Sequence, residues 1–119
     1  MNYKSDVGKL GEDMACGYLL NKGYKILERN YRQKWGELDI IAEDSANTLV
    51  FVEVKTIRQS GNSESAELKP EDNLTAAKLR KLQRTAQLFA GFHPELINEK
   101  RGWRIDLVAI TIPANKISH

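Results

Sequence analysis

The chain has 119 residues, 41% of them hydrophobic and 29% charged, and a formal net charge of +2 at pH 7, which suits one domain with an ordinary polar surface. No apolar run approaches the roughly 20 residues that a membrane helix requires, and residues 1–14 lack the apolar stretch of a secretory signal, so we expect no membrane partner. The single cysteine, Cys16, can form neither an internal disulfide nor a thiolate zinc cluster, which favours a reducing, cytoplasmic setting.

The first expected element is a helix that begins at Ser5, a suitable cap, continues to about Asn21 and is ended by Gly23. At 100° per residue, its core-facing side consists of small and apolar residues: Val7, Gly11, Met14 and Tyr18, with Ala15 and Leu19 beside them. Glu12 lies at the margin of this side, and Asp13 points away from it. The small residues Gly8, Gly11 and Ala15 indicate either the close approach of another backbone or ordinary tight packing.

Three strand-like stretches follow the first helix. Residues 24–32 are mixed and basic, which is typical of an edge strand. Residues 38–42 are apolar except at Asp39, and residues 47–55 are apolar on both faces until charges appear at their end, as in a central strand covered on both sides. The turn at residues 43–47 predicts that the second and third strands form a hairpin.

The remaining elements complete an αβββαβ order. Residues 56–73 are rich in Ser, Gly, Asn and Glu and are expected to form a long surface loop. A second helix over about residues 74–92 has Lys81 and Arg84 on its far side, and its buried stripe is Leu79, Leu82, Ala86 and Phe89. Residues 103–112 form a last strand that is apolar on both faces. Because the second helix is long enough for a right-handed crossover to a parallel strand, we expect an α/β fold with a mixed central sheet flanked by helices.

Charged residues at the end of the third strand are the first candidates for chemistry. Strand period places Glu53 and Lys55 on one face, roughly 7 Å apart. Charges that end a buried strand are costly unless they are paired, exposed or functional, so the alternative is a strand that simply meets water here.

Asp39 strengthens the functional alternative. It interrupts an apolar strand, and pairing with the next strand would bring it to about 5 Å from Glu53. Two carboxylates at that distance repel each other, and a divalent cation removes the penalty. Oxygen donors without His or Cys favour Mg²⁺ or Mn²⁺, and the two histidines, His93 and His119, are far from this cluster in sequence.

Glu12, Asp39, Glu53 and Lys55 together resemble the PD-(D/E)XK nuclease pattern, in which an acid on the first helix and an acid on a strand precede acid-x-lysine on the next strand. Longer segments resemble the YraN-like family of uncharacterised bacterial proteins, itself similar to archaeal Holliday junction resolvases: Gly8-x-x-Gly11-Glu12, Arg29-Asn30-Tyr31-Arg32, Gly36-Glu37-Leu38-Asp39-Ile40-Ile41-Ala42, Phe51-Val52-Glu53-Val54-Lys55 and Arg104-Ile105-Asp106. Glu-x-Lys alone is weakly specific, but the ordered set covers nearly the whole chain. The resemblance implies a restriction-endonuclease-like three-layer core and a single nuclease-like domain over residues 1–119.

The expected site follows from this pattern. Asp39, Glu53 and the Val54 carbonyl would hold Mg²⁺ or Mn²⁺, and Lys55 would orient the attacking water or neutralise charge on the phosphate. Glu12 would bind through water or help a second cation. Glu37 lies on the same side of its strand as Asp39 and is expected to support the metal ligands, with a solvated acid as the alternative.

Basic residues are the expected nucleic-acid contacts: Arg29, Arg32, Lys34, Arg58 and Lys78. The alternative for each basic cluster is a solvated face. Trp35, next to Gly36, could stack on a base or wedge a junction, or it could be an exposed turn residue. Asp106 is expected to pair with Arg104 or with a helix end.

The resulting hypothesis is a metal-dependent endonuclease that hydrolyses phosphodiester bonds of DNA, in particular branched or structured DNA. Two alternatives remain open: a non-catalytic nucleic-acid-binding module on a nuclease scaffold, and an adaptor that acts through protein contacts. Resolvase activity would require a homodimer, because two strands are cut symmetrically.

Overall fold

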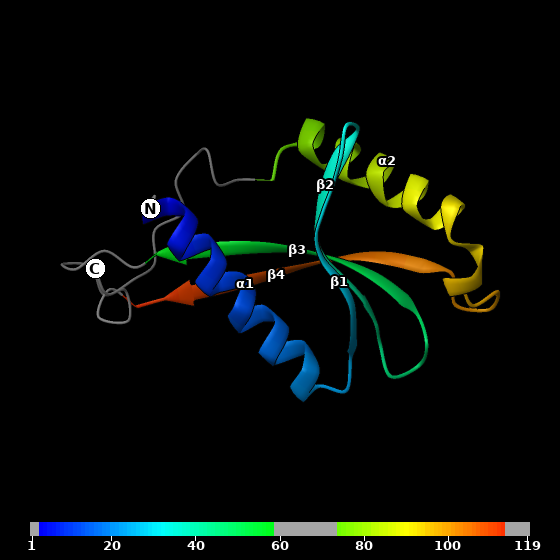
Figure 1. Ribbon diagram of the computed structural model, residues 1–119, viewed down its shortest axis with the longest axis horizontal. Helices are drawn as coiled ribbons and strands as arrows, with labels where there is room; N and C mark the ends of the chain where they lie inside the picture. Colours follow the sequence, from blue (N-terminus) through cyan, green and yellow to red (C-terminus); the bar gives the residue numbers. More distant parts are fainter. Residues whose placement is uncertain (1–2, 59–73, 114–119) are drawn as a thin grey trace.

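The computed structural model describes residues 3–58 and 74–113. Its elements, drawn in Figure 1, are α1 (Tyr3–Asn21), β1 (Lys25–Gln33), β2 (Gly36–Glu43), β3 (Leu49–Arg58), α2 (Ala76–Phe92), the short 3₁₀ helix η2 (Pro94–Leu96) and β4 (Trp103–Ile112). Within these residues, neither α-helix has the length and apolar character that a membrane crossing requires. The observed order of helices and strands is the expected αβββαβ.

The four strands form one mixed sheet in the order β1-β2-β3-β4. The first three strands are antiparallel neighbours, whereas β3 and β4 run parallel over ten residue pairs. Two strands with parallel pairing need a crossover connection, and α2 lies in it. The predicted hairpin of β2 and β3, the edge position of β1 and the central position of β3 are therefore confirmed.

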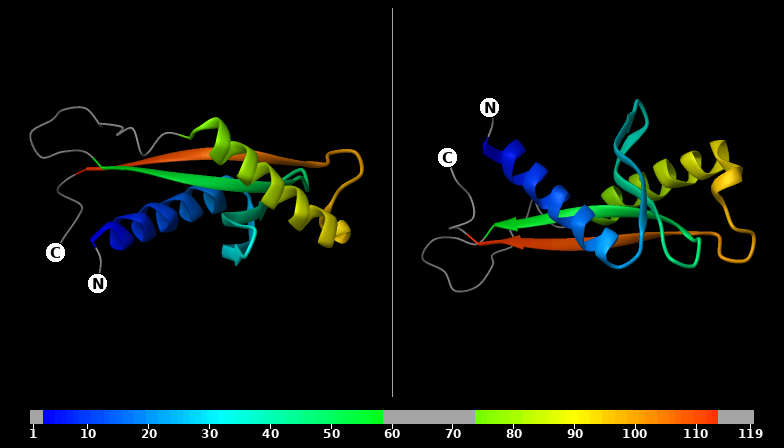
Figure 2. Two further views of the ribbon diagram at one scale, coloured as in Figure 1. Left: turned by 90° about the horizontal axis from the view of Figure 1, so that it is seen from above. Right: turned by 60° about the horizontal axis from the view of Figure 1, so that its bottom comes forward.

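Each helix covers one face of the sheet and has its own buried cluster, which gives the expected three-layer α/β fold (Figures 1 and 2). On the α2 side, Phe51 lies edge-on to Phe89 and Trp103, with ring centroids 5.6 and 5.5 Å apart. On the α1 side, Cys16 packs with Ala15, Leu19 and the valines of β3. A strand covered on both faces needs apolar residues at consecutive positions, which explains the unbroken run Leu49–Val52.

The buried side of α1 differs from the predicted one. The helix begins at Tyr3, so Ser5 lies inside it and is not its cap. Gly11, Ala15 and Leu19 face the sheet as predicted, but Met14 and Tyr18 are 43% and 48% exposed. The cause is close packing: a Cβ at Gly11 would collide with the side chain of Thr56, whereas one at Gly8 would meet nothing. Small residues thus lie against β3 at the point of closest approach, and Met14 and Tyr18 lie outside.

Two further boundaries correct the prediction. Residues 56–58 belong to β3 instead of a loop, because its parallel pairing with β4 continues to Arg58 opposite Ile112; residues 59–73 of the expected loop lie outside the described residues. The second helix begins at Ala76, and the Thr75 side chain caps it. Leu79 is 36% exposed, while Thr85 is fully buried in the stripe.

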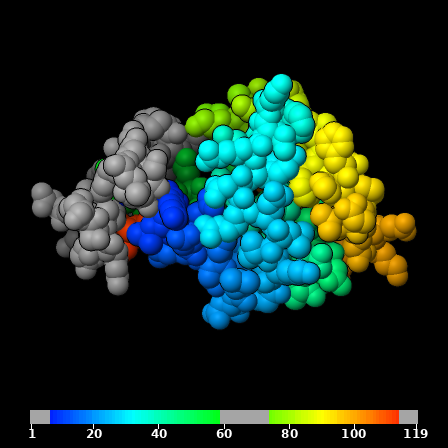
Figure 3. Space-filling model, viewed as in Figure 1, coloured from blue at the N-terminus to red at the C-terminus, as the bar shows by residue number. Residues whose placement is uncertain are grey.

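The β1–β2 hairpin leaves the sheet toward α2. β2 pairs with β1 along its whole length but with β3 only over residues 40–43. The hairpin tip lies against α2, as Figure 3 shows in cyan beside yellow and lime. The Thr85 hydroxyl lies 3.3 Å from the Trp35 carbonyl oxygen, to which it can donate. Gly36, with φ 155°, touches the same threonine side chain, and a Cβ there would collide with it. Over residues 36–39, β2 therefore separates from β3, and its beginning lies against α2.

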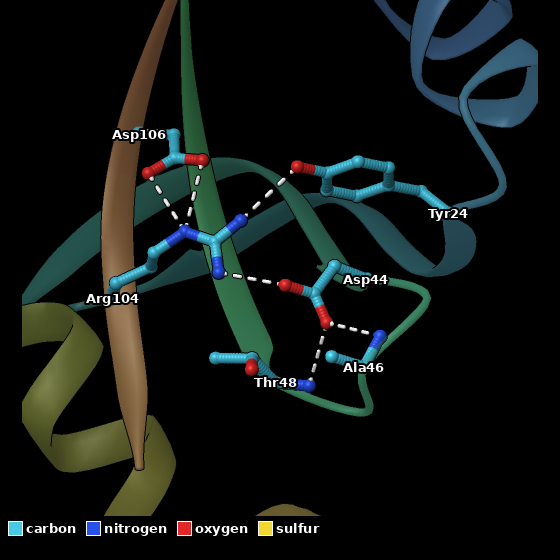
Figure 4. Close-up of polar contacts among 6 residues, drawn as sticks. All are labelled: Tyr24, Asp44, Ala46, Thr48, Arg104 and Asp106. Atoms are coloured by element: carbon cyan, nitrogen blue, oxygen red, sulfur yellow. Dashed lines mark hydrogen bonds and ion pairs between the residues drawn. The ribbon is translucent and has the colours of Figure 1, made fainter. Parts of the chain in front are cut away.

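A polar network fastens the opposite end of the sheet (Figure 4). Arg104 donates to Asp44 at 2.7 Å, to Asp106 at 3.1 Å and to the Tyr24 hydroxyl at 3.1 Å. Asp44 also accepts the amides of two residues in its own turn at 2.9 Å. Burial raises the pKa of Asp44, but these hydrogen bonds outweigh it, so the pKa is lowered overall. The expected pairing of Asp106 with Arg104 is confirmed, and its role is structural.

Candidate active site

Asp39 lies where β2 turns away from β3. The last pair between these strands is Ile40 with Val52. One more step in the same register places Asp39 across from Glu53. The amide of Val54 donates a 2.8 Å hydrogen bond to Asp39 Oδ2. The antiparallel register therefore brings together two acids that are 14 residues apart in sequence.

A cleft of about 690 Å³ opens at this point, between the hairpin, α2 and the outer parts of β3 and β4. Asp39, Glu53 and Lys55 all line it, together with Glu37. Lysines from two other elements line the same cleft: Lys34, Lys78 and Lys81. The cleft thus combines a pair of acids with a surround of amines.

The acidic pair is electrostatically strained. Burial, the charge of Asp39 and a hydrogen bond to Asp39 raise the pKa of Glu53 to about 7, and Lys55 only partly offsets this. Burial also raises the pKa of Asp39, although hydrogen bonds from the Val54 amide and from Glu53 act in the opposite direction. Without a cation, the pair is best satisfied when Glu53 keeps a proton and donates it to Asp39.

Glu12 lies on the α1 side of the sheet. It lines a second cleft, of about 650 Å³, together with Asp39 and Val54. The Glu12 side chain is 12% exposed, so it is more buried than its predicted marginal position implies. Arg29 holds it: the guanidinium donates to Glu12 Oε1 at 3.2 Å and to Asp13 Oδ1 at 2.6 Å.

Asp39 lines both clefts, so Glu12 and Glu53 approach it from opposite sides. Among residues 3–58 and 74–113, no three His, Cys, Asp or Glu side chains come close enough to form a metal-binding group. The oxygen donors that do meet are the Asp39 and Glu53 carboxylates beside the Val54 backbone. Carboxylates without nitrogen or sulfur neighbours are of the kind that Mg²⁺ and Mn²⁺ accept.

Four of the five predicted nucleic-acid contacts divide between the two clefts. Arg29 and Arg32 line the second cleft, and Lys34 and Lys78 line the first. Arg58 lies at the exposed end of β3 and lines neither.

Lys81 is the cleft residue that the sequence argument missed. The sequence predicts Lys81 on the far side of α2, and the residue is indeed exposed, but it lies next to the buried Leu82 and lines the cleft with it. The signal that could have found it is the four-residue spacing to the buried Thr85, whose hydroxyl is 2.9 Å from the Lys81 carbonyl oxygen. A polar residue buried on the same helix face indicates a second packing partner.

The fold and the cleft define a class: a small three-layer α/β protein with a mixed four-stranded sheet and an acidic pair where two strands diverge. Within this class, the chain belongs to the uncharacterised protein family UPF0102, whose model matches residues 11–110. This confirms the resemblance to the YraN-like family that the ordered segments indicated.

Relatives in that family come from several bacteria. A UPF0102 protein of Persephonella marina is 41% identical over 112 residues, covering 94% of this chain and 87% of the relative. One of Thermotoga petrophila is 41% identical over 104 residues, covering 87% and 84%. One of Clostridium botulinum, strain Loch Maree, is 40% identical over 113 residues, covering 94% and 85%.

Proposed function

We propose that this protein is a Mg²⁺- or Mn²⁺-dependent endonuclease that hydrolyses phosphodiester bonds of DNA, with branched or structured DNA as its substrate. The observation that carries the proposal is the pair Asp39 and Glu53, in a cleft that also contains Lys55. Glu53 keeps its proton near neutral pH because too little positive charge lies close to the two carboxylates to offset their burial and repulsion. A divalent cation bound between Asp39 and Glu53 would supply that charge, and Glu53 would then give up its proton to solvent.

The metal ligands would be the Asp39 and Glu53 carboxylates and the Val54 carbonyl. A divalent cation held there would supply Lewis-acid chemistry, polarising the scissile phosphate and lowering the pKa of a water. The hydrogen bond from the Val54 amide fixes one oxygen of Asp39, which leaves the other oxygen for a ligand. Glu37, in the same cleft, adds negative charge that strengthens cation binding.

The lysines of the cleft would act on the phosphate. Lys55 follows Glu53 on the same face of β3, so its ammonium group can neutralise charge that grows on the phosphate oxygens. Lys34 and Lys81 line the cleft from the hairpin and from α2, and each is positioned to contact a neighbouring phosphate. The arrangement favours a strand that passes between the hairpin and α2.

Glu12 would contribute from the second cleft. Its present partner is the Arg29 guanidinium, so a cation bound on the α1 side of Asp39 would compete with Arg29 for it. We therefore assign Glu12 a supporting role through water or a second cation, and not direct ligation of the first.

The first test asks for the cation before any substrate is chosen. Titration calorimetry with Mg²⁺ and Mn²⁺ should give a saturable site in the wild type and at least tenfold weaker binding in Asp39→Asn. Glu28→Gln, which changes an exposed acid on the edge strand, is the matched control and should bind as the wild type does. Equal affinities in wild type and Asp39→Asn would contradict the metal assignment.

The second test asks for cleavage. The purified protein is incubated with labelled four-way junction, flapped, single-stranded and duplex DNA, with Mg²⁺ or with EDTA. Cleavage should require the cation and should be lost in Glu53→Ala. The enzyme assignment fails if cleavage is indifferent to the metal and Glu53→Ala cuts as the wild type does. DNA binding that survives EDTA and Asp39→Ala without any product would instead support the non-catalytic module.

Cleavage of a four-way junction would require two copies of the protein to act together. Symmetrical cuts on two strands need two active sites related by a twofold axis, so we propose a homodimer as the acting form. Light scattering should then give twice the chain mass of 13.5 kDa for the free protein, or two chains per junction for the protein bound to DNA. If a monomer cleaves the junction, the protein cuts one strand at a time and the dimer proposal is wrong.

A further inference from the structure

An exposed apolar patch lies at the hairpin tip, outside the acidic site. Trp35 and Phe92 are 38% and 63% exposed, and Leu88 is 37% exposed. The two rings face each other at an angle of 47°, with centroids 6.3 Å apart. We call Trp35, Leu88 and Phe92 the tip patch. Aromatic rings of this size are rarely left in water without a use, because their burial is among the largest apolar gains available.

The tip patch is held firmly. The Thr85 hydroxyl lies within hydrogen-bond distance of the Trp35 carbonyl oxygen, and the next residue, Gly36, packs against the same threonine. Positions 81, 85, 88 and 92 recur at the helix repeat and form one stripe along α2. The hairpin tip therefore rests on this stripe, which orders the rings before any ligand arrives.

The patch continues directly into the cleft. Lys34 and Gly36, the two neighbours of Trp35 in sequence, both line the cleft that contains Asp39 and Glu53. Lys81, at the other end of the α2 stripe, lines it too. A ligand that spans both regions must offer a flat apolar face at one end and negative charge at the other. A nucleotide within a strand has both, because each base is tied to a phosphate.

We propose that Trp35 and Phe92 form a stacking platform for an unpaired nucleobase, whose strand continues along the lysines into the cleft. This inference rests on the proposed function, because it takes the strand in the cleft to be nucleic acid. It narrows the substrate class to DNA with a single-stranded segment or an opened junction. A fully paired duplex hides the faces of its bases, so it cannot use the platform.

The test compares strands of equal charge that differ only in their bases. Fluorescence anisotropy in EDTA, where no strand is cut, measures the affinity for a single-stranded oligonucleotide and for the same backbone with abasic sites. Stacking of one or two bases should make the base-bearing strand bind about 5-fold to 100-fold more tightly. Trp35→Ala and Phe92→Ala should each remove most of this ratio without changing the affinity for the abasic strand more than about twofold.

A matched control exists on the other side of the molecule. Tyr18 on α1 is an exposed aromatic residue with the Lys22 ammonium 5.1 Å from its ring, so it has similar chemistry but lies away from the cleft. Tyr18→Ala should leave the ratio unchanged, and Trp35→Phe, which keeps a ring, should retain part of it. Tryptophan emission in a Trp103→Phe background provides a second measurement, because a base stacked on Trp35 should quench it.

The outcomes separate this inference from the proposed function. If the protein binds both strands equally, or if Trp35→Ala leaves the base-dependent ratio intact, the platform is wrong while nucleic-acid binding stands. If no oligonucleotide binds, the platform is wrong and the tip patch is then a contact for a protein partner, whereas the proposed function is decided by its own cleavage test with Mg²⁺. The platform is supported if Trp35→Ala loses the ratio and if, in the Trp103→Phe background, the base-bearing strand quenches Trp35 emission while the abasic strand does not.

Discussion

The strain between Asp39 and Glu53 predicts that Glu53→Gln stabilises the metal-free protein at alkaline pH. The pKa of Glu53 is raised from 4.5 to about 7 in the folded protein. The glutamine amide can still donate to Asp39, as the protonated carboxyl does, but it carries no charge that must be buried. The substitution therefore removes a cost without removing the hydrogen bond.

The sign and magnitude follow from proton linkage. Below pH 4.5, Glu53 is protonated in both folded and unfolded chains, and it adds no cost. Between that pH and about 7, only the folded chain keeps the proton, so wild-type stability falls as the pH rises, and above this range the loss is constant. Each tenfold change in proton affinity is worth about 1.4 kcal/mol, which gives an upper limit of about 3 kcal/mol. Because Glu53 borders an open cleft, screening reduces this to about 1–2 kcal/mol.

Urea unfolding in EDTA at several pH values provides the assay. At about pH 8, Glu53→Gln should be more stable than the wild type by about 1–2 kcal/mol, or by about 4–10 °C in the melting temperature. At about pH 4, the two should agree within about 0.5 kcal/mol, and Glu28→Gln, the exposed control, should follow the wild type throughout. A destabilised Glu53→Gln at pH 8, or a difference that does not change with pH, would refute the electrostatic argument.

Three further substitutions test the framework around the site. Asp44→Ala should lower the free energy of unfolding by about 2 kcal/mol at pH 7, because it removes the partner of Arg104 and the acceptor of two turn amides. Since the pKa of Asp44 is lowered, the stability that its charge contributes is present above pH 3.8 and is lost as the pH falls below that value. If wild type and Asp44→Ala differed in urea titrations at about pH 2.5 by as much as at pH 7, this electrostatic account would be contradicted. Gly11→Ala should cost about 2–3 kcal/mol in thermal unfolding, and a second change, Thr56→Ala, should recover much of it; simple additivity would contradict the contact. Phe51→Ala should cost about 3–5 kcal/mol in urea unfolding, and a loss below about 1 kcal/mol would mean that the α2-side core is not packed as described.

The sequence predicted the sheet well because its signals are local. The apolar run before Glu53 identifies a strand covered on both faces, and the turn after Glu43 identifies its hairpin partner. Once those two strands pair, the alignment of Asp39 with Glu53 follows from counting residues. The central part of the candidate site could therefore be derived from strand period and turn position alone.

Helix faces were harder to predict because they depend on the partner. Tyr18 and Leu79 fit an apolar stripe by periodicity, yet both lie at the border of what the sheet covers. On α1, the deciding factor is the distance of closest approach at Gly11, and no apolar count contains that information. On α2, the side that carries Thr85 packs against the hairpin tip instead of against the sheet alone. A helix that contacts two different elements cannot be described by a single stripe.

The divergence of β2 from β3 explains why an acidic pair occurs at this place in the fold. Where β2 and β3 remain paired, the helices cover both faces of the sheet, and burying two carboxylates there would be too costly. Where they separate, the Val54 amide loses its partner in the ladder and takes Asp39 Oδ2 instead, so one carboxylate replaces a missing backbone acceptor. This hydrogen bond from the Val54 amide fixes Asp39 between two clefts, with Glu53 on one side and Glu12 on the other. The site thus arises from the geometry of strand separation, and the same separation opens the cleft that the proposed function assigns to a strand of nucleic acid.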